Sequence, residues 1–212
     1  MHLVPTQDEV LALLRSTGGL REGHFEYPTG SHASEYLQVA LTMRYYQAAK
    51  ILSVGLSRLL RAHADIRAMI PELSIVAPAT GGLPVAYGVS EALRAHQVYW
   101  AERDGSGETF RLRQFLEPQP GEKVLLVDDI LRTGTRLSAV KKLVEANGGE
   151  VVGIAVVIYE PAPGAVSFDL LPFYYLAKLD GGYFKDAALL RLAAHYTDAH
   201  PIAFPRLPEN LK

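Results

Sequence analysis

The chain has 212 residues, a formal net charge of −2 and no cysteine. This length fits one domain, or one domain with a small appendage. The near-neutral charge argues against a general binder of nucleic acids or membrane surfaces, and the lack of cysteine excludes disulfides and cysteine-based metal sites or nucleophiles. No segment is apolar for long enough to span a bilayer, and the first residues lack the layout of a signal peptide. We therefore expect a cytoplasmic protein with no nucleic-acid or membrane partner.

The first part of the chain predicts a helix followed by two short strands. Thr6 and Glu9 have the spacing of a capping box, so a helix should begin there and stop near Gly18-Gly19. Residues 23–39 then alternate aromatic and polar side chains around a Pro-Thr-Gly sequence, which is typical of two strands joined by a turn.

The central part of the chain alternates helical and strand patterns. Helical spacing of apolar residues predicts a long helix over 46–60, and further helices are expected from near Pro84, over 137–146 and near 186–195. Short apolar runs predict buried strands at 73–77, 97–101, 124–127 and 150–159. This alternation predicts an α/β fold in which a Rossmann-like, mostly parallel sheet is flanked by helices.

The stretch 123–136, KVLLVDDILRTGTR, carries the strongest chemical signal. Asp128 and Asp129 follow a buried strand, and a glycine turn over 132–136 opens the next helix. A glycine turn at a helix start offers unpaired N–H groups to a phosphate, whereas two carboxylates suit hydroxyl donors or a hydrated divalent cation. Ribose 5-phosphate is the simplest group that satisfies both halves. The alternative is that the acids form a strand-end turn and a helix cap.

Two further stretches carry charge or glycine where a site could form. Pro78 to Gly82 is a second strand, glycine turn and helix arrangement, hence a second candidate anion site, although a glycine pair also suits a plain tight turn. The polar segment 102–113 predicts a charged hairpin, whose arginines could serve a site or face solvent.

These motifs resemble those of a known family. VLLVDDILRTGT, residues 124–135, resembles the phosphoribosyl pyrophosphate (PRPP) signature of the type I phosphoribosyltransferases. Residues 23–38 resemble the N-terminal hood of the orotate branch, with Gly-His-Phe, then Gly and His, then Tyr-Leu-Gln in place. Ala101-Glu102-Arg103 and Leu112-Arg113 resemble the lid of one branch of these enzymes. The resemblance implies the type I phosphoribosyltransferase fold as a single domain over 1–212, with a hood mainly over 18–43 plus part of the C-terminal segment.

The resemblance also implies roles for individual residues. The catalytic residues would be Asp128, Asp129, Arg103 and Glu102. The two acids would hold the ribose hydroxyls, and the 5-phosphate would lie against Arg132, Thr133, Gly134, Thr135 and Arg136. Pyrophosphate would be bound by Ala79, Thr80, Gly81 and Gly82 with the lid residues Arg103, Arg111 and Arg113. The base would contact Phe25, Tyr36 and Glu160.

The resemblance implies transfer of a phosphoribosyl group from PRPP to a nucleobase, with orotate as the leading base and pyrophosphate as the second product. Mg²⁺ would be held through PRPP and not directly by protein ligands, and a homodimer is expected. Where orotate enzymes end the 150–159 strand with Asp-Arg, this chain has Tyr159-Glu160. Two alternatives therefore stay open: another base, or a non-catalytic regulator that binds PRPP or a nucleotide.

Overall fold

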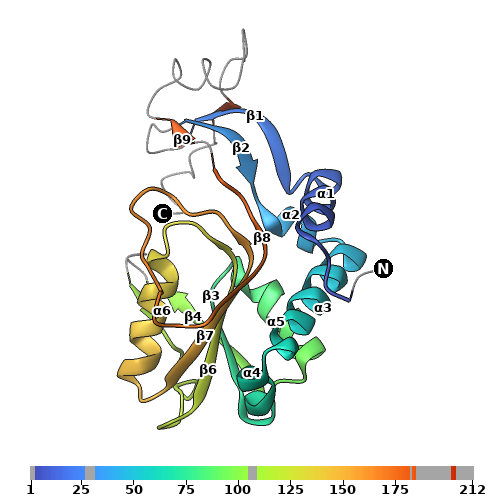
Figure 1. Cartoon of the computed structure of the whole chain (residues 1–212). Coiled ribbons are helices and arrows are strands. Elements are labelled where there is room, and N and C mark those ends of the chain that lie inside the picture. Colours follow the sequence, from blue (N-terminus) through green and yellow to red (C-terminus); the bar gives the residue numbers. More distant parts are fainter. Residues whose placement is uncertain (1–2, 27–31, 105–108, 182, 185–201, 204–212) are drawn as a thin grey trace.

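The structure is a computed structural model, and it describes residues 3–26, 32–104, 109–181, 183–184 and 202–203. It contains a six-stranded main sheet and a smaller four-stranded sheet, which we call the hood (Figure 1). Within these described ranges, no helix is both long enough and apolar enough to cross a membrane.

The main sheet has the strand order β5-β4-β3-β6-β7-β8. All neighbouring strands are parallel except β4 and β5, which form an antiparallel hairpin. The mostly parallel α/β fold predicted from the alternating pattern is therefore confirmed. The bounds are β3 Ser74–Pro78, β4 Gln97–Arg103, β5 Phe110–Arg111, β6 Lys123–Leu131, β7 Glu150–Tyr159 and β8 Phe173–Lys178.

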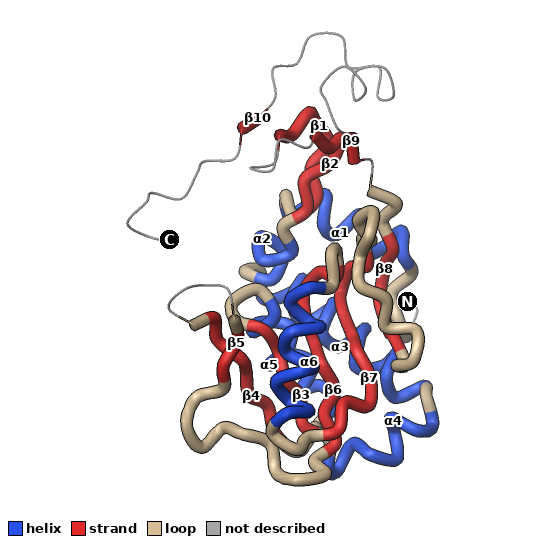
Figure 2. Tube along the Cα trace, turned by 90° about the vertical axis from the view of Figure 1, so that its left-hand side faces the viewer, coloured by secondary structure: helices blue, strands red, loops and turns tan. Residues whose placement is uncertain are grey.

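Helices cover both faces of the main sheet, so its central strands are mostly apolar. In Figures 1 and 2, α6 lies on one face, and α3 and α5 lie on the other. Residues 124–127 of β6 are fully buried between these layers. The helix bounds are α3 Tyr46–Ala62, α5 Gly82–Leu93 and α6 Thr135–Ala146, and the short α4 Ala64–Met69 and η1 Ile70–Glu72 lead from α3 to β3.

The hood is preceded by α1, Gln7–Thr17, which begins at the predicted capping box. Glu9 N donates to Thr6 Oγ1 at 3.2 Å, and Thr6 N donates to Glu9 Oε2 at 2.8 Å. The helix ends at Gly18, whose φ of +75° is a left-handed value that glycine adopts without strain.

The hood has the strand order β10-β1-β2-β9 and lies beyond the carboxyl ends of the main-sheet strands (Figure 1). A short helix, α2 Val39–Met43, leads from it into the body. The predicted turn at 28–30 and the predicted helix near 186–195 lie outside the described residues. The hood strands are β1 Leu20–Glu26, β2 His32–Leu37, β9 Tyr183–Phe184 and β10 Ile202–Ala203.

Two predicted boundaries in the stretch 123–136 were wrong. The sequence suggested that the strand ends at Val127 and that the acids follow it, but β6 continues to Leu131 and contains both Asp128 and Asp129. The reason is pairing with β7, which continues through Leu131 opposite Tyr159. The helix after the turn begins at Thr135, two residues earlier than expected.

We predict that Leu126→Ala lowers the free energy of unfolding by about 3 kcal/mol, because Leu126 is fully buried in the middle of β6 and the change leaves a cavity. Urea unfolding followed by circular dichroism measures this loss. The matched control is Leu170→Ala, at a leucine that is 98% exposed, which should change the stability by less than about 0.5 kcal/mol. Equal losses in the two variants would contradict this assignment of the core.

Candidate active site

The carboxyl ends of β6 and β3 bring two acids against two glycines. Asp128 is 1% exposed and Asp129 is 9% exposed. A Cβ atom added to Gly81 would lie 2.9 Å from Asp129 Oδ2, and one added to Gly82 would lie 2.9 Å from Asp128 Oδ1. Both separations are shorter than a normal carbon–oxygen contact, so the chain can approach the acids this closely here because Gly81 and Gly82 have no Cβ atom. The two motifs found separately in the sequence therefore form one site.

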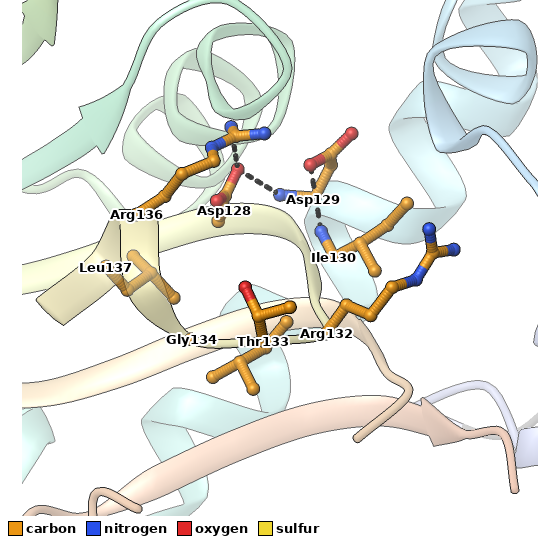
Figure 3. Close-up of a pocket in the computed structure, with 9 residues that line it drawn as sticks. Asp128, Asp129, Ile130, Arg132, Thr133, Gly134, Arg136 and Leu137 are labelled. Carbon is orange, nitrogen blue, oxygen red and sulfur yellow. Dashed lines mark hydrogen bonds and ion pairs between the residues drawn. The ribbon is translucent and has the colours of Figure 1, made fainter. Parts of the chain in front are cut away.

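Each acid is oriented by the backbone that follows it. Asp128 Oδ1 accepts a hydrogen bond from Asp129 N at 2.9 Å, and Asp129 Oδ1 accepts one from Ile130 N at 2.9 Å. The guanidinium of Arg136 lies over Asp128, with Nη2 at 3.3 Å from Oδ1 (Figure 3). These contacts fix both carboxylates beside an open pocket of about 170 Å³ that is lined by residues 128–134, 136 and 137.

Burial and charge act in opposite directions on Asp128. Burial raises the pKa of its carboxyl group well above the ordinary value, the neighbouring Asp129 raises the pKa further, and Arg136 lowers it. Arg136 Nε is buried and, among the described residues, has no hydrogen-bond partner. A buried N–H donor without a partner is costly, so this atom is suited to an acceptor supplied by a ligand.

The turn over 132–136 closes the pocket at the start of α6. Gly134 stands before the first helical residue with a φ of +74°. An added Cβ there would lie 3.0 Å from the Phe168 ring and 3.1 Å from Val166 Cβ. Thr133 Oγ1 and Thr135 Oγ1 are 2.9 Å apart and both side chains are exposed. This end of α6 therefore presents hydroxyl groups and helix N–H groups, as the anion-site prediction requires.

Arg132 does not join the other side chains of this turn. Its Nε and Nη2 donate to Glu160 Oε2 at 2.9 Å and 2.7 Å, and Glu160 is 3% exposed. Sequence reasoning missed this ion pair and found no arginine near Glu160. The pairing of Leu131 with Tyr159 is the signal that could have found it, because the next residues on the two strands are Arg132 and Glu160.

The glycine loop is anchored to the neighbouring strand. Ala79 N donates to Ala101 O at 2.8 Å, and Leu83 N donates to Thr80 O at 3.2 Å. The peptide bond between Ala79 and Thr80 is cis. Residues 79–82, predicted as one anion site, thus lie directly beside the acids predicted as the other.

The charged hairpin is present, although its tip at 105–108 lies outside the described residues. Glu102 Oε1 accepts from Arg113 Nε at 2.8 Å and from Trp100 Nε1 at 3.0 Å, and these hydrogen bonds, the one from Trp100 first, lower the pKa of Glu102. The Arg103 guanidinium lies 5.7 Å from the centre of the Phe110 ring. Arg111 is exposed and stands opposite Glu102. The structure pairs these residues with one another, and their roles toward a ligand stay predictions.

The predicted base contacts in the hood, Phe25 and Tyr36, lie near each other. The rings of Phe25 and Tyr36 are 5.5 Å apart, and Tyr36 Oη donates to Gln38 Oε1 at 2.9 Å. The half-buried Glu35 was not predicted as a site residue. Burial raises its pKa, Arg15 lowers it, and Glu160 and Glu22 raise it further. Glu160 is thus one of the charges that act on Glu35.

No group of three or more potential metal-binding side chains occurs within the described ranges. Mg²⁺ is commonly held by one or two carboxylates together with substrate phosphates and waters. The acid pair is of the residue type that such a site uses, and that Mg²⁺ is held through PRPP and not directly by the protein stays a prediction.

We predict that the wild-type protein loses stability relative to Asp128→Asn as the pH rises from about 4 towards 8. The raised pKa of Asp128 means that the folded state holds this proton more tightly than the unfolded chain, whose value is close to 3.8. Ionisation therefore costs stability as the pH rises through the folded-state pKa. Urea unfolding at a series of pH values measures the difference, with Asp65→Asn on the exposed face of α4 as control. Parallel curves for wild type and Asp128→Asn would contradict the prediction.

Comparison with known proteins gives the family. The family model described as phosphoribosyl transferase domain matches residues 58–167. An orotate phosphoribosyltransferase of Novosphingobium aromaticivorans is 33% identical over 175 residues, which covers 82% of this chain and 85% of the relative. One of Carboxydothermus hydrogenoformans is 36% identical over 161 residues, which covers 76% of this chain and 79% of the relative.

Solved structures share the fold at lower identity. The crystal structure of orotate phosphoribosyltransferase from Aeropyrum pernix has a TM-score of 0.63 at 19% identity, covering 89% of this chain and 99% of that one. The adenine phosphoribosyltransferase of Thermoanaerobacter pseudethanolicus has a TM-score of 0.62 at 18% identity, covering 79% and 99%. Enzymes named for different bases thus share the fold, so the fold alone does not select the base. The matched model spans the glycine loop, the acid pair and the 132–136 turn, and the chain belongs to the phosphoribosyltransferase family.

Proposed function

We propose that this protein transfers the phosphoribosyl group of PRPP to orotate, forming a nucleotide and releasing pyrophosphate. The observation that carries the proposal is the contact between the acid pair at the end of β6 and the glycine pair at the end of β3. This contact joins a site for ribose hydroxyls to a site for an anion. The choice of orotate is supported by relatives of that name that are 33% and 36% identical over more than three quarters of both chains.

In this proposal the acids and the turn hold the ribose 5-phosphate part of PRPP. The ribose hydroxyls donate to the carboxylates of Asp128 and Asp129. The 5-phosphate accepts from the N–H groups at the start of α6 and from the hydroxyls of Thr133 and Thr135. Arg136 reaches the same pocket from α6, and its buried Nε supplies a further donor. The acceptors of the protein thus face the hydroxyl groups of the ribose, and its donors face the phosphate.

The pyrophosphate part lies against the glycine loop. The backbone of residues 79–82 approaches the acids closely, so a ligand held by Asp129 is also within reach of that loop. Arg103, Arg111 and Arg113 on the hairpin β4–β5 add positive charge that stabilises the leaving pyrophosphate. Mg²⁺ enters with PRPP and neutralises part of its charge.

The reaction breaks the bond between the ribose C1 and pyrophosphate and forms a bond between C1 and a base nitrogen. The protein supplies mainly positioning, because sites on two strand ends hold the two ends of PRPP in fixed relation. Exclusion of water from the site favours the base over water as the acceptor of the phosphoribosyl group. We also propose a cytoplasmic homodimer, which the family resemblance supports and light scattering of the purified protein would test.

A second candidate function is transfer of the phosphoribosyl group to a base that bears an amino group, and two carboxylates favour it. Glu160 follows β7 and contributes to the raised pKa of Glu35, and carboxylates suit a base that presents N–H donors. A panel of bases in a pyrophosphate-release assay separates the candidates, with calorimetric titration of PRPP and Mg²⁺ alongside. Release with orotate supports the main proposal, release only with an amino-bearing base supports the second, and PRPP binding without release on any base supports a regulator.

We predict that Asp129→Asn lowers kcat/KM at least about 100-fold, because the variant loses a carboxylate that accepts from a ribose hydroxyl and helps to hold the metal–PRPP complex. Pyrophosphate release under steady-state conditions measures the loss. Asp65→Asn on α4 is the control with the same chemical change. Unchanged turnover in Asp129→Asn would remove the acid pair from the mechanism.

We predict that Gly82→Ala lowers kcat/KM at least about 10-fold while the protein stays folded. The new Cβ would meet Asp128 Oδ1 at 2.9 Å, Ala77 Cβ at 3.1 Å and Val127 O at 3.2 Å, so the loop or the acid must shift. Gly121→Ala is the control, because its added Cβ meets nothing within 4 Å although its φ of +77° adds backbone strain. A similar fall in activity for both variants would show that the effect is not local to the acid pair.

A further inference from the structure

The place of the base follows from the geometry of the displacement. The base attacks C1 from the side opposite to the departing pyrophosphate. With the ribose on the acids of β6 and pyrophosphate on the loop after β3, the leaving group lies on the β3 side of β6. The opposite side is occupied by β7, which pairs with β6 as far as Leu131 and Tyr159. The base therefore belongs beside the end of β7, where the next residue is Glu160.

Two described cations stand at this part of the sheet edge. Lys178 ends β8, one strand further out, and its Nζ lies 2.9 Å from Asp180 Oδ1. Arg132 extends from the end of β6 to Glu160 and lines the open pocket. Figure 3 shows Arg132 and Arg136 on opposite sides of the acid pair, so the two arginines of the turn face different parts of a bound ligand.

The backbone fixes where the Arg132 guanidinium lies. Glu160 N donates to Leu131 O at 2.9 Å, Ala162 N donates to Arg132 O at 3.1 Å, and Val166 N donates to Thr133 O at 2.9 Å. The loop after β7 is thus hydrogen-bonded residue by residue to the chain after β6. The carboxylate of Glu160 is 4% exposed, whereas the Arg132 side chain is 26% exposed. The buried acid holds the arginine, and the arginine reaches the pocket.

We propose that Arg132 binds the carboxylate of the base and that Glu160 is the residue that positions it, an inference that rests on orotate being the substrate. A guanidinium carries five N–H donors in a rigid fork, more than one carboxylate oxygen can accept, so it can bridge two carboxylates from different edges. The Glu160 carboxylate already holds the Arg132 side chain in place before the base binds. Arg132 therefore loses less rotational freedom when it binds the base. A base-binding cation is thus supplied by the strand that carries the ribose-binding acids.

This assignment differs from a phosphate-binding role for Arg132, and kinetics with both substrates separate the two. The test measures pyrophosphate release while orotate and PRPP are varied in turn, for wild type, Arg132→Gln and Arg132→Lys. Arg132→Gln should raise KM for orotate about 10- to 100-fold, the range for loss of one charge-assisted hydrogen bond, and leave KM for PRPP within about 3-fold. Arg132→Lys should recover only part of the loss, because lysine lacks the fork. Lys178→Gln is the control that removes a charge from the same edge.

A double variant keeps the test decisive if Arg132→Gln is unstable, since that change leaves the buried Glu160 unpaired. Arg132→Gln with Glu160→Gln removes both charges and restores a neutral pair. If Arg132 binds the base, the double variant folds but keeps the raised KM for orotate. If the pair is only structural, the double variant recovers the wild-type KM, and the proposal is overturned.

The other possible results of these kinetic measurements also separate the alternatives. A rise in KM for PRPP with KM for orotate unchanged would assign Arg132 to the phosphate and overturn the inference. Failure of the wild-type protein to use orotate at all would instead overturn the proposed substrate, and the inference with it. Glu160→Gln alone should raise KM for orotate less than Arg132→Gln does while kcat changes little, which is the pattern expected of a positioning residue.

Discussion

The close contact between two acids and two glycines is the constraint on which the rest of the site depends. Asp128 and Asp129 lie inside β6, and the loop after β3 passes so near to them that a single carbon atom at Gly81 or Gly82 would reach their oxygens. The parallel pairing of β3 with β6 sets this distance, because both strands present their carboxyl ends at the same edge. A ligand with hydroxyls next to a pyrophosphate can then be held by two loops that belong to different parts of the sequence.

The charges at this edge are arranged as two ion pairs. Arg136 lies over Asp128 on one side, and Arg132 lies against Glu160 on the other. Burying carboxylates is costly unless they are paired, so each arginine stabilises an acid while no substrate is present. Each arginine also lines the open pocket, which lets the same side chains meet the anionic groups of a substrate. The site is preorganised by its own ion pairs.

Much of the fold could be predicted because its signals are local. The apolar run of β7 and the capping box of α1 each depend on neighbouring residues, and each lies where the pattern placed it. The end of β6 could not be predicted as well, because pairing with β7 carries the strand through two acids that are poor strand formers. Tertiary pairing here outweighs local preference.

The parts of the site that were missed depend on residues far apart in the chain. Arg132 and Glu160 are 28 positions apart and meet only because β6 and β7 are neighbours in register. Glu160 also contributes to the raised pKa of Glu35, although the two residues lie far apart in the sequence. Motif spacing thus locates the acid pair and the two glycine turns, whereas the pairing of Arg132 with Glu160 requires the three-dimensional arrangement.

A crystal structure of the protein with ribose 5-phosphate bound tests the central claim most directly. The account predicts that the ribose hydroxyls lie within hydrogen-bond distance, about 2.6–3.2 Å, of the carboxylates of Asp128 and Asp129, with the phosphate at the start of α6. A ligand whose phosphate lies elsewhere, or whose hydroxyls do not touch these acids, would contradict it.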